Sequence, residues 1–391
     1  MKAASYLDNR FNNPVRDPVW GNIMLSDGFK KIVSSPVLQK MNRIKQLGPT
    51  YLVYPGAVHT RFSHSLGVYH IGTRIIRKLI TFGSCPKVSE EGVRAFLCAC
   101  LLHDLGHFPY THSLKELPLK EHEALTAEYI LSEPLFSLIK ESLEIDPFMA
   151  AAIVDENLET ADPEVVFFRH ILSGVLDPDK LDYLTRDARF CGVPYGIQDI
   201  DFVLSSICPD PEKGICLLPQ GEPALENILF SKYMMYKTVY WHKTVRCATG
   251  MIKKAIVSAL EENVLKPEEL YGLDDYSLVN FCRDLDLPAL ELISMVQERN
   301  LYKMSFETVF DDNLPEHRAL LDLKTRSSKE RELAAALGTE EMKIIIDVPE
   351  KINFDNHEAF RIFAAPLRKI RIFASPDISE RIRGIKESGL I

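Results

Sequence analysis

The chain has 391 residues, of which 46% are hydrophobic and 26% are charged. That composition is typical of one large or two modest globular domains and excludes disordered, collagen-like and coiled-coil proteins. The formal net charge of −9 makes nucleic acid an unlikely partner, because non-specific binding depends on Lys and Arg neutralising phosphates. The sequence shows neither an apolar run long enough to span a bilayer nor a signal-like N-terminal stretch, so we expect a cytoplasmic protein with no membrane partner.

The eight cysteines form no CxxC pair, which favours a reducing compartment and argues against a zinc ribbon. Most of the chain follows the 3.6-residue period of helices, and this predicts a mainly α fold. Residues 1–28 are rich in Asn, Asp, Pro and Gly and predict an extended, strand-like beginning. Short helices are expected near 29–34 and 36–46.

Two longer helices follow, with a histidine at the start of the buried stripe of the first and another at the end of the second. From Ser63 the spacing predicts a helix whose buried stripe begins with His64 and continues with Val68, Ile71, Ile75 and Leu79. The next helix ends at His103 and Asp104, just before Gly106, after the apolar stripe of Val93, Phe96, Leu97, Cys100 and Leu101. His64 and Asp104 are therefore expected to face inward.

Further along, Asp177 and Pro178 predict an N-cap and first turn of a helix that ends near Gly192. Residues 223–264 predict one long helix. The runs at 342–348, 359–365 and 369–375 predict strands. We therefore expect a helical domain over 1–265, with its core at 40–250, and a small C-terminal α+β module over 266–391. Assembly, regulation and simple capping of the helical core are the alternatives for the role of this module.

Histidine is unevenly distributed along the chain. Seven of the eleven lie between residues 59 and 122, where an even spread would give about two. His64, the pair His103 and Asp104, and Asp179 come from three predicted helices, each near a buried face. Burying an unpaired carboxylate is costly, whereas a divalent cation would neutralise both carboxylates. The alternative is a set of hydrogen-bonded core residues, but the four together favour a metal site.

These residues resemble the signature of a known family. The separated H, HD and D, with HTRFSHSLGVYHIG at 59–72, LLHDLGHFPYTHS at 101–113 and DPDKLDYLTRDARFCGV at 177–193, are similar to the HD-domain metal-dependent phosphohydrolases. Among these, the closest resemblance is to the deoxynucleoside triphosphate triphosphohydrolase branch. The resemblance covers roughly residues 40–250.

The resemblance implies a role for each matching residue. It makes His64, His103, Asp104 and Asp179 the ligands of a divalent metal, which could be Mn, Mg, Fe, Ni or Zn given the mixed nitrogen and oxygen donors. It also assigns histidines to proton transfer, for which an imidazole near its own pKa is suited, and an arginine to phosphate binding, for which the forked guanidinium is suited. The catalytic histidines are His107 and His122, and the phosphate-binding residues are His112 and Arg61. The alternatives are an exposed helix-start histidine for His122 and a surface salt bridge for Arg61.

The helix that begins at Pro178 carries Lys180, Tyr183 and Asp187 on one face, because they are spaced i, i+3 and i+7. Without the resemblance, a solvated Lys–Asp pair would be the better interpretation. The resemblance instead gives the ammonium to phosphate and the phenol and carboxylate to the sugar. It places Asp187 on the 3′-hydroxyl together with Gln46.

Later, Lys232, Tyr236, Tyr240 and Lys243 are predicted to share one helical face, which by itself favours packing into the core. The resemblance implies that Tyr240 lies under the deoxyribose and rejects ribonucleotides, and that Lys232 contacts the γ-phosphate. Similar enzymes often have arginine at the latter position. Since lysine cannot make the forked contact, the preferred phosphate chain length is left open.

The best interpretation is a hydrolase that converts deoxynucleoside triphosphates to deoxynucleoside and triphosphate by attack of metal-activated water at the α-phosphate. One alternative is an HD hydrolase of nucleoside monophosphates or cyclic nucleotides. The other is a nucleotide-binding regulatory protein whose site has decayed. Similar enzymes commonly form homo-oligomers and respond to nucleotide effectors, and we expect both here, although no motif marks an interface or an effector site.

Overall fold

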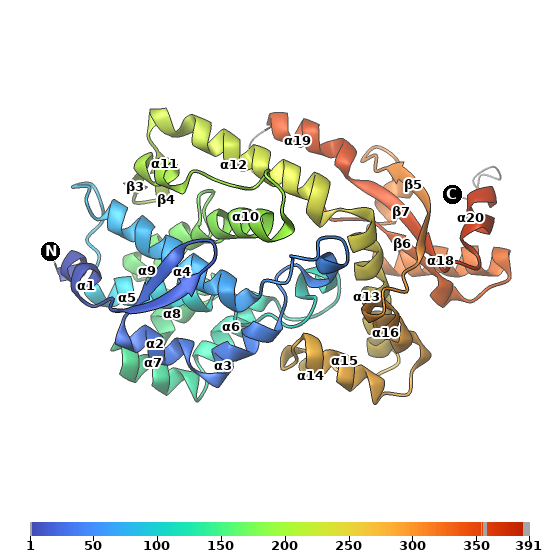
Figure 1. Cartoon of the computed structure of the whole chain (residues 1–391), viewed down its shortest axis with the longest axis horizontal. Coiled ribbons are helices and arrows are strands. Elements are labelled where there is room, and N and C mark those ends of the chain that lie inside the picture. Colours follow the sequence, from blue (N-terminus) through green and yellow to red (C-terminus); the bar gives the residue numbers. More distant parts are fainter. Residues whose placement is uncertain (1, 353, 355–357, 386–391) are drawn as a thin grey trace. The chain divides into compact units, whose positions relative to one another are not determined.

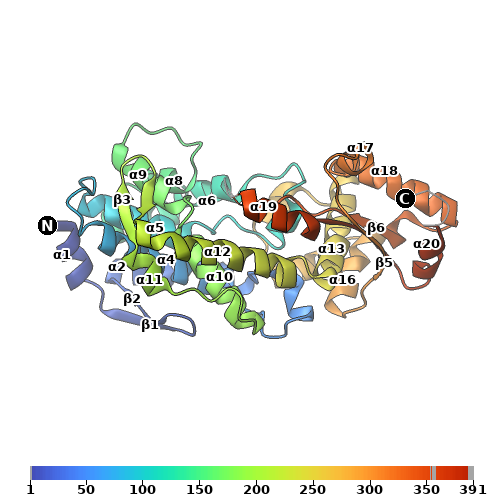
Figure 2. The same ribbon diagram turned by 90° about the horizontal axis from the view of Figure 1, so that it is seen from above.

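The computed structural model describes residues 2–352, 354 and 358–385, and its chain divides into two compact units, each described below by itself. Helices dominate both, which confirms the predicted mainly α fold (Figures 1 and 2). The first unit consists of Met1–Gln46, Gly56–Pro109 and Lys120–Lys232, and the second of Leu47–Pro55, Tyr110–Leu119 and Tyr233–Ile391.

Helices make up most of the first unit, with two antiparallel strand pairs, β1–β2 and β3–β4, beside them. Its α-helices are α1 (Lys2–Asn9), α2 (Asp27–Val33), α3 (Pro36–Gln39), α4 (Arg61–Leu79), α5 (Glu90–Leu102), α6 (His122–Ile130), α7 (Leu135–Leu143), α8 (Pro147–Val154), α9 (Pro163–Leu172), α10 (Pro178–Cys191), α11 (Ile200–Ser205) and α12 (Glu222–Met235), which runs on into the second unit. Its strands are β1 (Asn13–Asp17), β2 (Gly21–Leu25), β3 (Ile207–Asp210) and β4 (Gly214–Leu217), and its 3-10 helices are η1 (Lys40–Arg43) and η4 (Pro219–Gly221).

The centre of this unit is α4, which packs against both α5 and α10. The predicted stripe of α4 is confirmed, since its members are all buried: His64, Val68, Ile71, Ile75 and Leu79. Every residue of α5 from Gly92 to Leu102 except Arg94 is buried, so this helix crosses the middle of the unit. The predicted limits of α10 are also confirmed, with Asp177 as N-cap and Gly192 in the left-handed region at φ 69°.

The extended beginning predicted for residues 1–28 is only partly correct. Strands β1 and β2 do form a hairpin over residues 13–25, but Lys2–Asn9 is helical. The helix forms because it can bury Tyr6 and Leu7 where α1 packs against α5. Tertiary packing of this kind decides the structure of a segment with weak local preference.

The second unit combines helices with a three-stranded antiparallel sheet of order β5–β7–β6. Its elements are η2 (Gly48–Leu52), η3 (Thr111–Leu114), the π-helical turn η5 (Tyr236–Tyr240), α13 (Lys243–Glu261), α14 (Pro267–Tyr271), α15 (Asp275–Arg283), η6 (Pro288–Leu290), α16 (Glu291–Gln297), β5 (Lys303–Val309), α17 (Pro315–Ala319), α18 (Leu323–Leu337), η7 (Glu341–Lys343), β6 (Ile344–Asp347), α19 (Glu358–Ala364), η8 (Ala365–Leu367), β7 (Lys369–Ala374) and α20 (Ser379–Ile385). Figure 1 shows the three strands as adjacent arrows with α18 beside them.

This unit begins ahead of the predicted boundary between residues 265 and 266. It takes in α13, which the sequence pattern assigns to the first domain, because α13 packs against α16 and against β6. The predicted division into a catalytic domain and an accessory module is also a statement about function. That functional division stays a prediction.

Two of the three predicted C-terminal strands are present, as β6 and β7, but the prediction for 359–365 is wrong. That stretch lies largely in α19, where Ala364 is buried while Ile362 and Phe363 are 66% and 65% exposed. Its alanines are strong helix formers, and the run lacks the alternation of a half-buried strand. The sheet's third strand is β5, which we had not predicted.

The single long helix predicted for residues 223–264 is also wrong. It is α12, the π-helical turn η5 and then a separate helix, α13, whose N-cap His242 accepts a hydrogen bond from the backbone of Thr244. A π-turn and a new cap both change the angular register of the side chains. Lys232, Tyr236, Tyr240 and Lys243 therefore do not lie on one continuous helical face.

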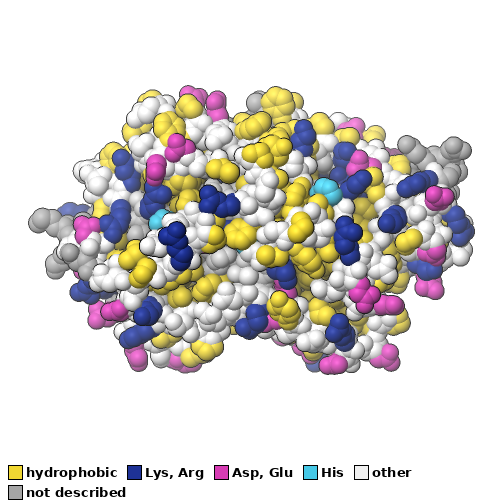
Figure 3. Space-filling model, viewed as in Figure 1, with side chains coloured by type: hydrophobic (Ala, Val, Ile, Leu, Met, Phe, Trp, Pro, Cys, Tyr) yellow, Lys and Arg dark blue, Asp and Glu magenta, His cyan; other side chains and the backbone are white. Residues whose placement is uncertain are grey.

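None of the helices within the described ranges is long and apolar enough to cross a membrane. Acidic and basic side chains are interspersed on the face drawn in Figure 3.

Candidate metal centre and its surroundings

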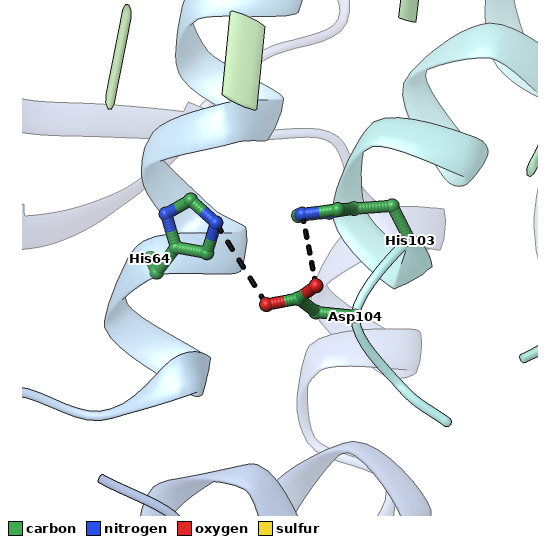
Figure 4. A group of neighbouring side chains, drawn as sticks. All are labelled: His64, His103 and Asp104. Carbon is green, nitrogen blue, oxygen red and sulfur yellow. Dashed lines mark ion pairs between the residues drawn. The ribbon is translucent and has the colours of Figure 1, made fainter. Parts of the chain in front are cut away.

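Four predicted metal ligands meet in the first unit where α4, the end of α5 and the start of α10 come together. The ligand atoms of His64, His103 and Asp104 lie within 4.8 Å of one another (Figure 4). Asp179 completes the group, with Oδ1 at 2.9 Å from His64 Nε2 and 3.8 Å from His103 Nε2. The side chain of Asp179 is 37% exposed while that of His64 is 1% exposed, so the group is reached from the Asp179 side.

Both histidines of this group are oriented through their other ring nitrogen. Nδ1 of His64 lies 2.8 Å from Asp182 Oδ2, and Nδ1 of His103 lies 3.0 Å from the carbonyl oxygen of Cys100. Since carbonyl and carboxylate oxygens only accept, each Nδ1 must donate. The two Nε2 atoms are buried and face carboxylate oxygens, His64 Nε2 at 2.9 Å from Asp179 and His103 Nε2 at 3.3 Å from Asp104. This is the arrangement by which proteins present imidazole nitrogens to a metal.

The carboxylate behind His64 belongs to a buried network that sequence reasoning missed. Arg186 donates to both oxygens of Asp182, at 2.8 Å from Nε and 2.9 Å from Nη2, and its Nη1 donates to Asp17 at 2.8 Å. Trp20 Nε1 also donates to Asp182. Burial raises the pKa of Asp182, but Arg186 and His64 outweigh it and hold that pKa at about 2. The i, i+4 spacing of Asp182 and Arg186 was visible in the sequence, whereas their links to His64 and Asp17 were not.

A second group of histidines lies directly beside the first. His107 Nε2 is 3.1 Å from Asp104 Oδ1, and the rings of His107 and His122 stack with centroids 4.0 Å apart. Gly106 makes this possible, because a Cβ there would lie 2.1 Å from the carbonyl oxygen of His122. The Gly106 amide also donates to Thr126 of α6 at 2.8 Å. The two predicted catalytic histidines are thus adjacent, and Asp104 contacts the nearer one.

The charge states of these groups suit a cation site. Burial lowers the pKa of His64, but the carboxylates of Asp179 and Asp182 outweigh it and raise that pKa to about 10. Burial raises the pKa of Asp104, but His107, His103 and Arg61 together hold it well below its usual range. Two carboxylates therefore stay ionised among buried imidazoles, and protons on those imidazoles occupy the place that a divalent ion would take.

Arg61 is the first residue of α4 and is 3% exposed. Its Nη1 donates to Asp104 Oδ2 at 2.6 Å, and its Nε is buried with no partner. It is therefore neither a surface salt bridge nor remote from the cluster. The guanidinium contacts a ligand carboxylate and brings positive charge to the metal group.

The three residues of α10 that are predicted to bind the sugar and the phosphates differ from one another in burial and in hydrogen-bond partners. Lys180 Nζ donates to the Gly174 carbonyl oxygen at 2.8 Å and to its own N-cap, Asp177. Tyr183 is half-buried. Asp187 is 2% exposed, and its Oδ1 lies 2.7 Å from His59 Nε2, a contact that sequence reasoning did not anticipate.

Four other residues predicted to bind substrate are divided between the two units. Gln46 is in the first unit and has a buried, unpartnered Oε1. Lys232 is a half-buried residue of α12, at the end of the first unit. His112, which is exposed on η3, and Tyr240, whose ring lies 5.1 Å from that of Tyr236, belong to the second unit. The roles of all four stay predictions.

The donor set passes a direct test as a metal site. Two buried Nε2 atoms and two ionised carboxylates converge from three helices, which is a mixed nitrogen and oxygen set suited to a first-row divalent ion or magnesium. The residues present therefore fit a divalent cation, and the donors do not distinguish among Mn, Mg, Fe, Ni and Zn.

Two family models match this chain. Residues 61–171 match the HD domain model, and residues 211–371 match the model described as HD associated region. The uncharacterized protein MJ1154 of Methanocaldococcus jannaschii is 34% identical over 74% of this chain and 58% of its own length. YwfO of Bacillus subtilis, also uncharacterized, is 33% identical over 62% of this chain and 54% of its own. This chain thus spans little more than half of these relatives.

A relative with a named activity covers more of the chain. The human deoxynucleoside triphosphate triphosphohydrolase SAMHD1 is 26% identical over 92% of this chain and 66% of its own length. Among solved structures, a hypothetical protein from Aquifex aeolicus has a TM-score of 0.74 at 26% identity, covering 95% of this chain and 99% of its own. The phosphohydrolase BT4208 from Bacteroides thetaiotaomicron shares the fold, with a TM-score of 0.72 at 22% identity over 93% of this chain and 99% of its own.

Proposed function

Because the chain belongs to the HD-domain phosphohydrolases, in the branch that resembles deoxynucleoside triphosphate triphosphohydrolases, we propose that it hydrolyses deoxynucleoside triphosphates to deoxynucleoside and triphosphate. The observation that carries the proposal is the convergence of His64, His103, Asp104 and Asp179, in which both buried imidazole Nε2 atoms face ligand carboxylates. The name of the human relative supports the choice of substrate. When bound by these four residues, a divalent ion supplies an activated water and offsets charge on phosphate oxygens.

The chain's own residues supply the proton transfers and the charge. His107 and His122 are stacked beside Asp104, where one imidazole can hold a proton and pass it to a leaving phosphate oxygen. Burial, the main cause, and Arg61 keep the pKa of His107 well below its usual range, so the ring is neutral near pH 7 and can polarise an attacking water. Arg61 and Lys180 stabilise the negative charge that develops on the phosphoryl oxygens.

The sugar and the distal phosphates are assigned to the remaining residues. Gln46 and Asp187 bind the 3′-hydroxyl, and Tyr183 contacts the sugar. Tyr240 excludes a 2′-hydroxyl, while Lys232 and His112 contact phosphates. His112 is exposed and Lys232 is half-buried. A homo-oligomer and a nucleotide effector belong to the same proposal.

The test begins with metal analysis of the purified protein. The same sample, supplemented with Mn or Mg, is then incubated with the four dNTPs, the four NTPs, a dNMP and a cyclic nucleotide, and the products are separated by ion exchange. Deoxynucleoside with intact triphosphate is the expected result. Turnover of only the monophosphate or the cyclic nucleotide would keep the metal site and discard the substrate.

A variant links the activity to the metal. His103→Ala combined with Asp104→Ala should remove bound metal and activity together while the far-UV circular dichroism stays that of a helical protein. His317→Ala, in α17 of the second unit, is the matched control and should change neither. Full activity in protein free of metal would overturn the mechanism.

A further inference from the structure

A short antiparallel ladder joins residues 44–46 to residues 59–61 in the first unit. The Gln46 amide donates to the His59 carbonyl oxygen at 3.0 Å, the Arg61 amide donates to the Ile44 carbonyl oxygen at 3.0 Å, and residues 45 and 60 form the bridge between them. Residues directly opposite each other in such a pair project their side chains to the same face. The ladder therefore makes His59 the cross-strand neighbour of Gln46.

The same histidine is held against α10. Its ring lies 4.7 Å from the ring of Phe190, measured between centroids, and its Nε2 lies 2.7 Å from Asp187 Oδ1. The loop can approach this closely because residue 56 is glycine, where a Cβ would lie only 2.4 Å from the Phe190 carbonyl oxygen. His59 thus connects Gln46 through its backbone to Asp187 through its side chain.

The chemistry of the His59 contact fixes its direction. An ionised carboxylate has no proton to give, so Nε2 of His59 donates and Asp187 Oδ1 accepts. Both side chains are buried, at 0% and 2% exposure, and a hydrogen bond to a charged group is worth more there than in water. The contact therefore fixes the plane of the carboxylate and the direction of its second oxygen.

One acceptor beside this pair lacks a donor. Gln46 Oε1 is buried and has no hydrogen-bond partner, which is costly unless something else supplies a proton. A hydroxyl group of a bound molecule would do so. A buried amide oxygen without a donor, on the residue paired across the ladder with His59, is placed to accept a proton from a ligand hydroxyl.

We propose that His59 is a positioning residue that orients Asp187 to recognise the 3′-hydroxyl of the nucleotide sugar. The inference rests on the proposed function, in which Gln46 and Asp187 bind that hydroxyl. What it adds is the part of His59, which is needed for the preference of that subsite for deoxynucleotides over 2′,3′-dideoxynucleotides. Orienting an acceptor in advance removes part of the cost of binding, and a ligand lacking the hydroxyl leaves buried polar groups unpaired.

The test measures binding as well as turnover. Dissociation constants of the four dNTPs and of their 2′,3′-dideoxy counterparts are measured by calorimetry on metal-stripped protein, for the wild type, three single variants and one double variant. His59→Phe keeps a ring against Phe190 but removes the donor. His59→Gln keeps a donor near the position of Nε2. The third variant, Asp187→Asn, is combined with His59→Phe to complete a double-mutant cycle.

The expected result is a dNTP preference in the wild type that falls about tenfold or more in His59→Phe, the size of a lost hydrogen bond to a charged group. Dideoxynucleotide binding should change less than twofold, and His59→Gln should recover most of the preference. Adding His59→Phe to Asp187→Asn should cost nothing further. A purely structural role would instead weaken both nucleotide types equally.

Two results would overturn the inference: equal binding of deoxy and dideoxy nucleotides by the wild type, or a preference that survives in His59→Phe. The proposed function is judged separately, by release of triphosphate from wild-type protein loaded with Mn or Mg. A protein that binds with 3′-hydroxyl preference but releases no triphosphate would refute the reaction and leave the role of His59 standing.

Discussion

His64 Nδ1 lies 2.8 Å from Asp182 Oδ2, and both side chains are completely or almost completely buried. The pair joins α4 to α10 and leaves His64 Nε2 directed at the metal group. Carboxylates in this position fix the tautomer and raise the basicity of a ligating imidazole. Asp182 therefore contributes to metal affinity although it is not one of the ligands.

Replacement of this carboxylate should weaken metal binding without touching a ligand. In Asp182→Asn the affinity for a divalent ion should fall about 10- to 100-fold, measured by competition with a chromophoric chelator. Loss of half of the Arg186 pair will also destabilise the fold, so circular dichroism must show that the variant is folded at the assay temperature. Asp201→Asn, which changes a carboxylate whose side chain is 87% exposed, should leave affinity unchanged. Wild-type affinity in a folded Asp182→Asn would contradict the role given to this residue.

Gly67 is the position that lets Asp182 and Arg186 come so close to α4. A Cβ there would lie 1.8 Å from Asp182 Oδ1 and 2.5 Å from Arg186 Nη2. Alanine is ordinarily favoured over glycine inside a helix by about 1 kcal/mol, so Gly67→Ala should stabilise the protein if only helix propensity mattered. We expect the opposite, a lower Tm and weaker metal binding, because the buried ion pair must move.

The matched control for this change is Gly83→Ala, since a Cβ at Gly83 meets no atom within 4 Å. Its Tm should differ little from that of the wild type. If Gly67→Ala matches the control in both Tm and metal content, the close approach of α10 to α4 is not needed for the site.

The comparison between sequence and structure explains why Asp182 was missed while Asp179 was found. Local signals were sufficient for the helix itself: the Asp177 cap, Pro178 and Gly192 each act within a few residues. The partners of Asp182 lie 118 residues away at His64 and 162 away at Trp20. No periodicity connects such positions, because only the packing of α4 on α10 brings them together.

The predictions for residues 223–264 and 359–365 were wrong because the local sequence of each segment is compatible with more than one backbone structure. The residues from 223 to 264 carry a helical pattern throughout, yet the backbone forms a π-turn over Tyr236–Tyr240 and begins a new helix after His242. Likewise, the apolar run at 359–365 suits either a strand or a helix by composition. Exposure of Ile362 and Phe363 shows that the surroundings, not the run, decided the outcome.

The stacked histidines should separate catalysis from metal binding. His107→Gln and His122→Gln each remove a proton-transfer group but none of the four metal ligands. We expect kcat for dNTP hydrolysis to fall by about 10² to 10⁴, with metal content by elemental analysis unchanged.

For the control, His70→Gln changes a histidine that packs beside Trp20 at 6.0 Å between centroids and whose pKa burial lowers to about 4. It should retain activity. Loss of metal in His107→Gln would instead show that His107 supports the ligand group and would remove the case for it as a separate catalytic group.

Acid stability of the second unit should depend on Asp347. Arg246 of α13 contacts both oxygens of this buried carboxylate, with Nε donating to Oδ2 at 2.9 Å. Burial raises the pKa of Asp347, but Arg246 outweighs it and lowers that pKa below its usual value. A carboxylate with a lowered folded-state pKa contributes stability that is present above its unfolded pKa of about 4 and is lost as the pH falls through the folded value.

Removing this charge should have two effects on unfolding measured by denaturant titration. At pH 7, Asp347→Asn should lower the free energy of unfolding by about 3 to 5 kcal/mol, since Arg246 is left buried without its counter-charge. Between pH 5 and pH 2 its stability should also fall less steeply than that of the wild type. In the wild type, Asp347 takes up a proton when the protein unfolds in acid, and asparagine at this position cannot do so. Asp286→Asn, an exposed position, should follow the wild type at every pH. Parallel acid profiles for wild type and Asp347→Asn would mean that the pair does not set the acid stability of this unit.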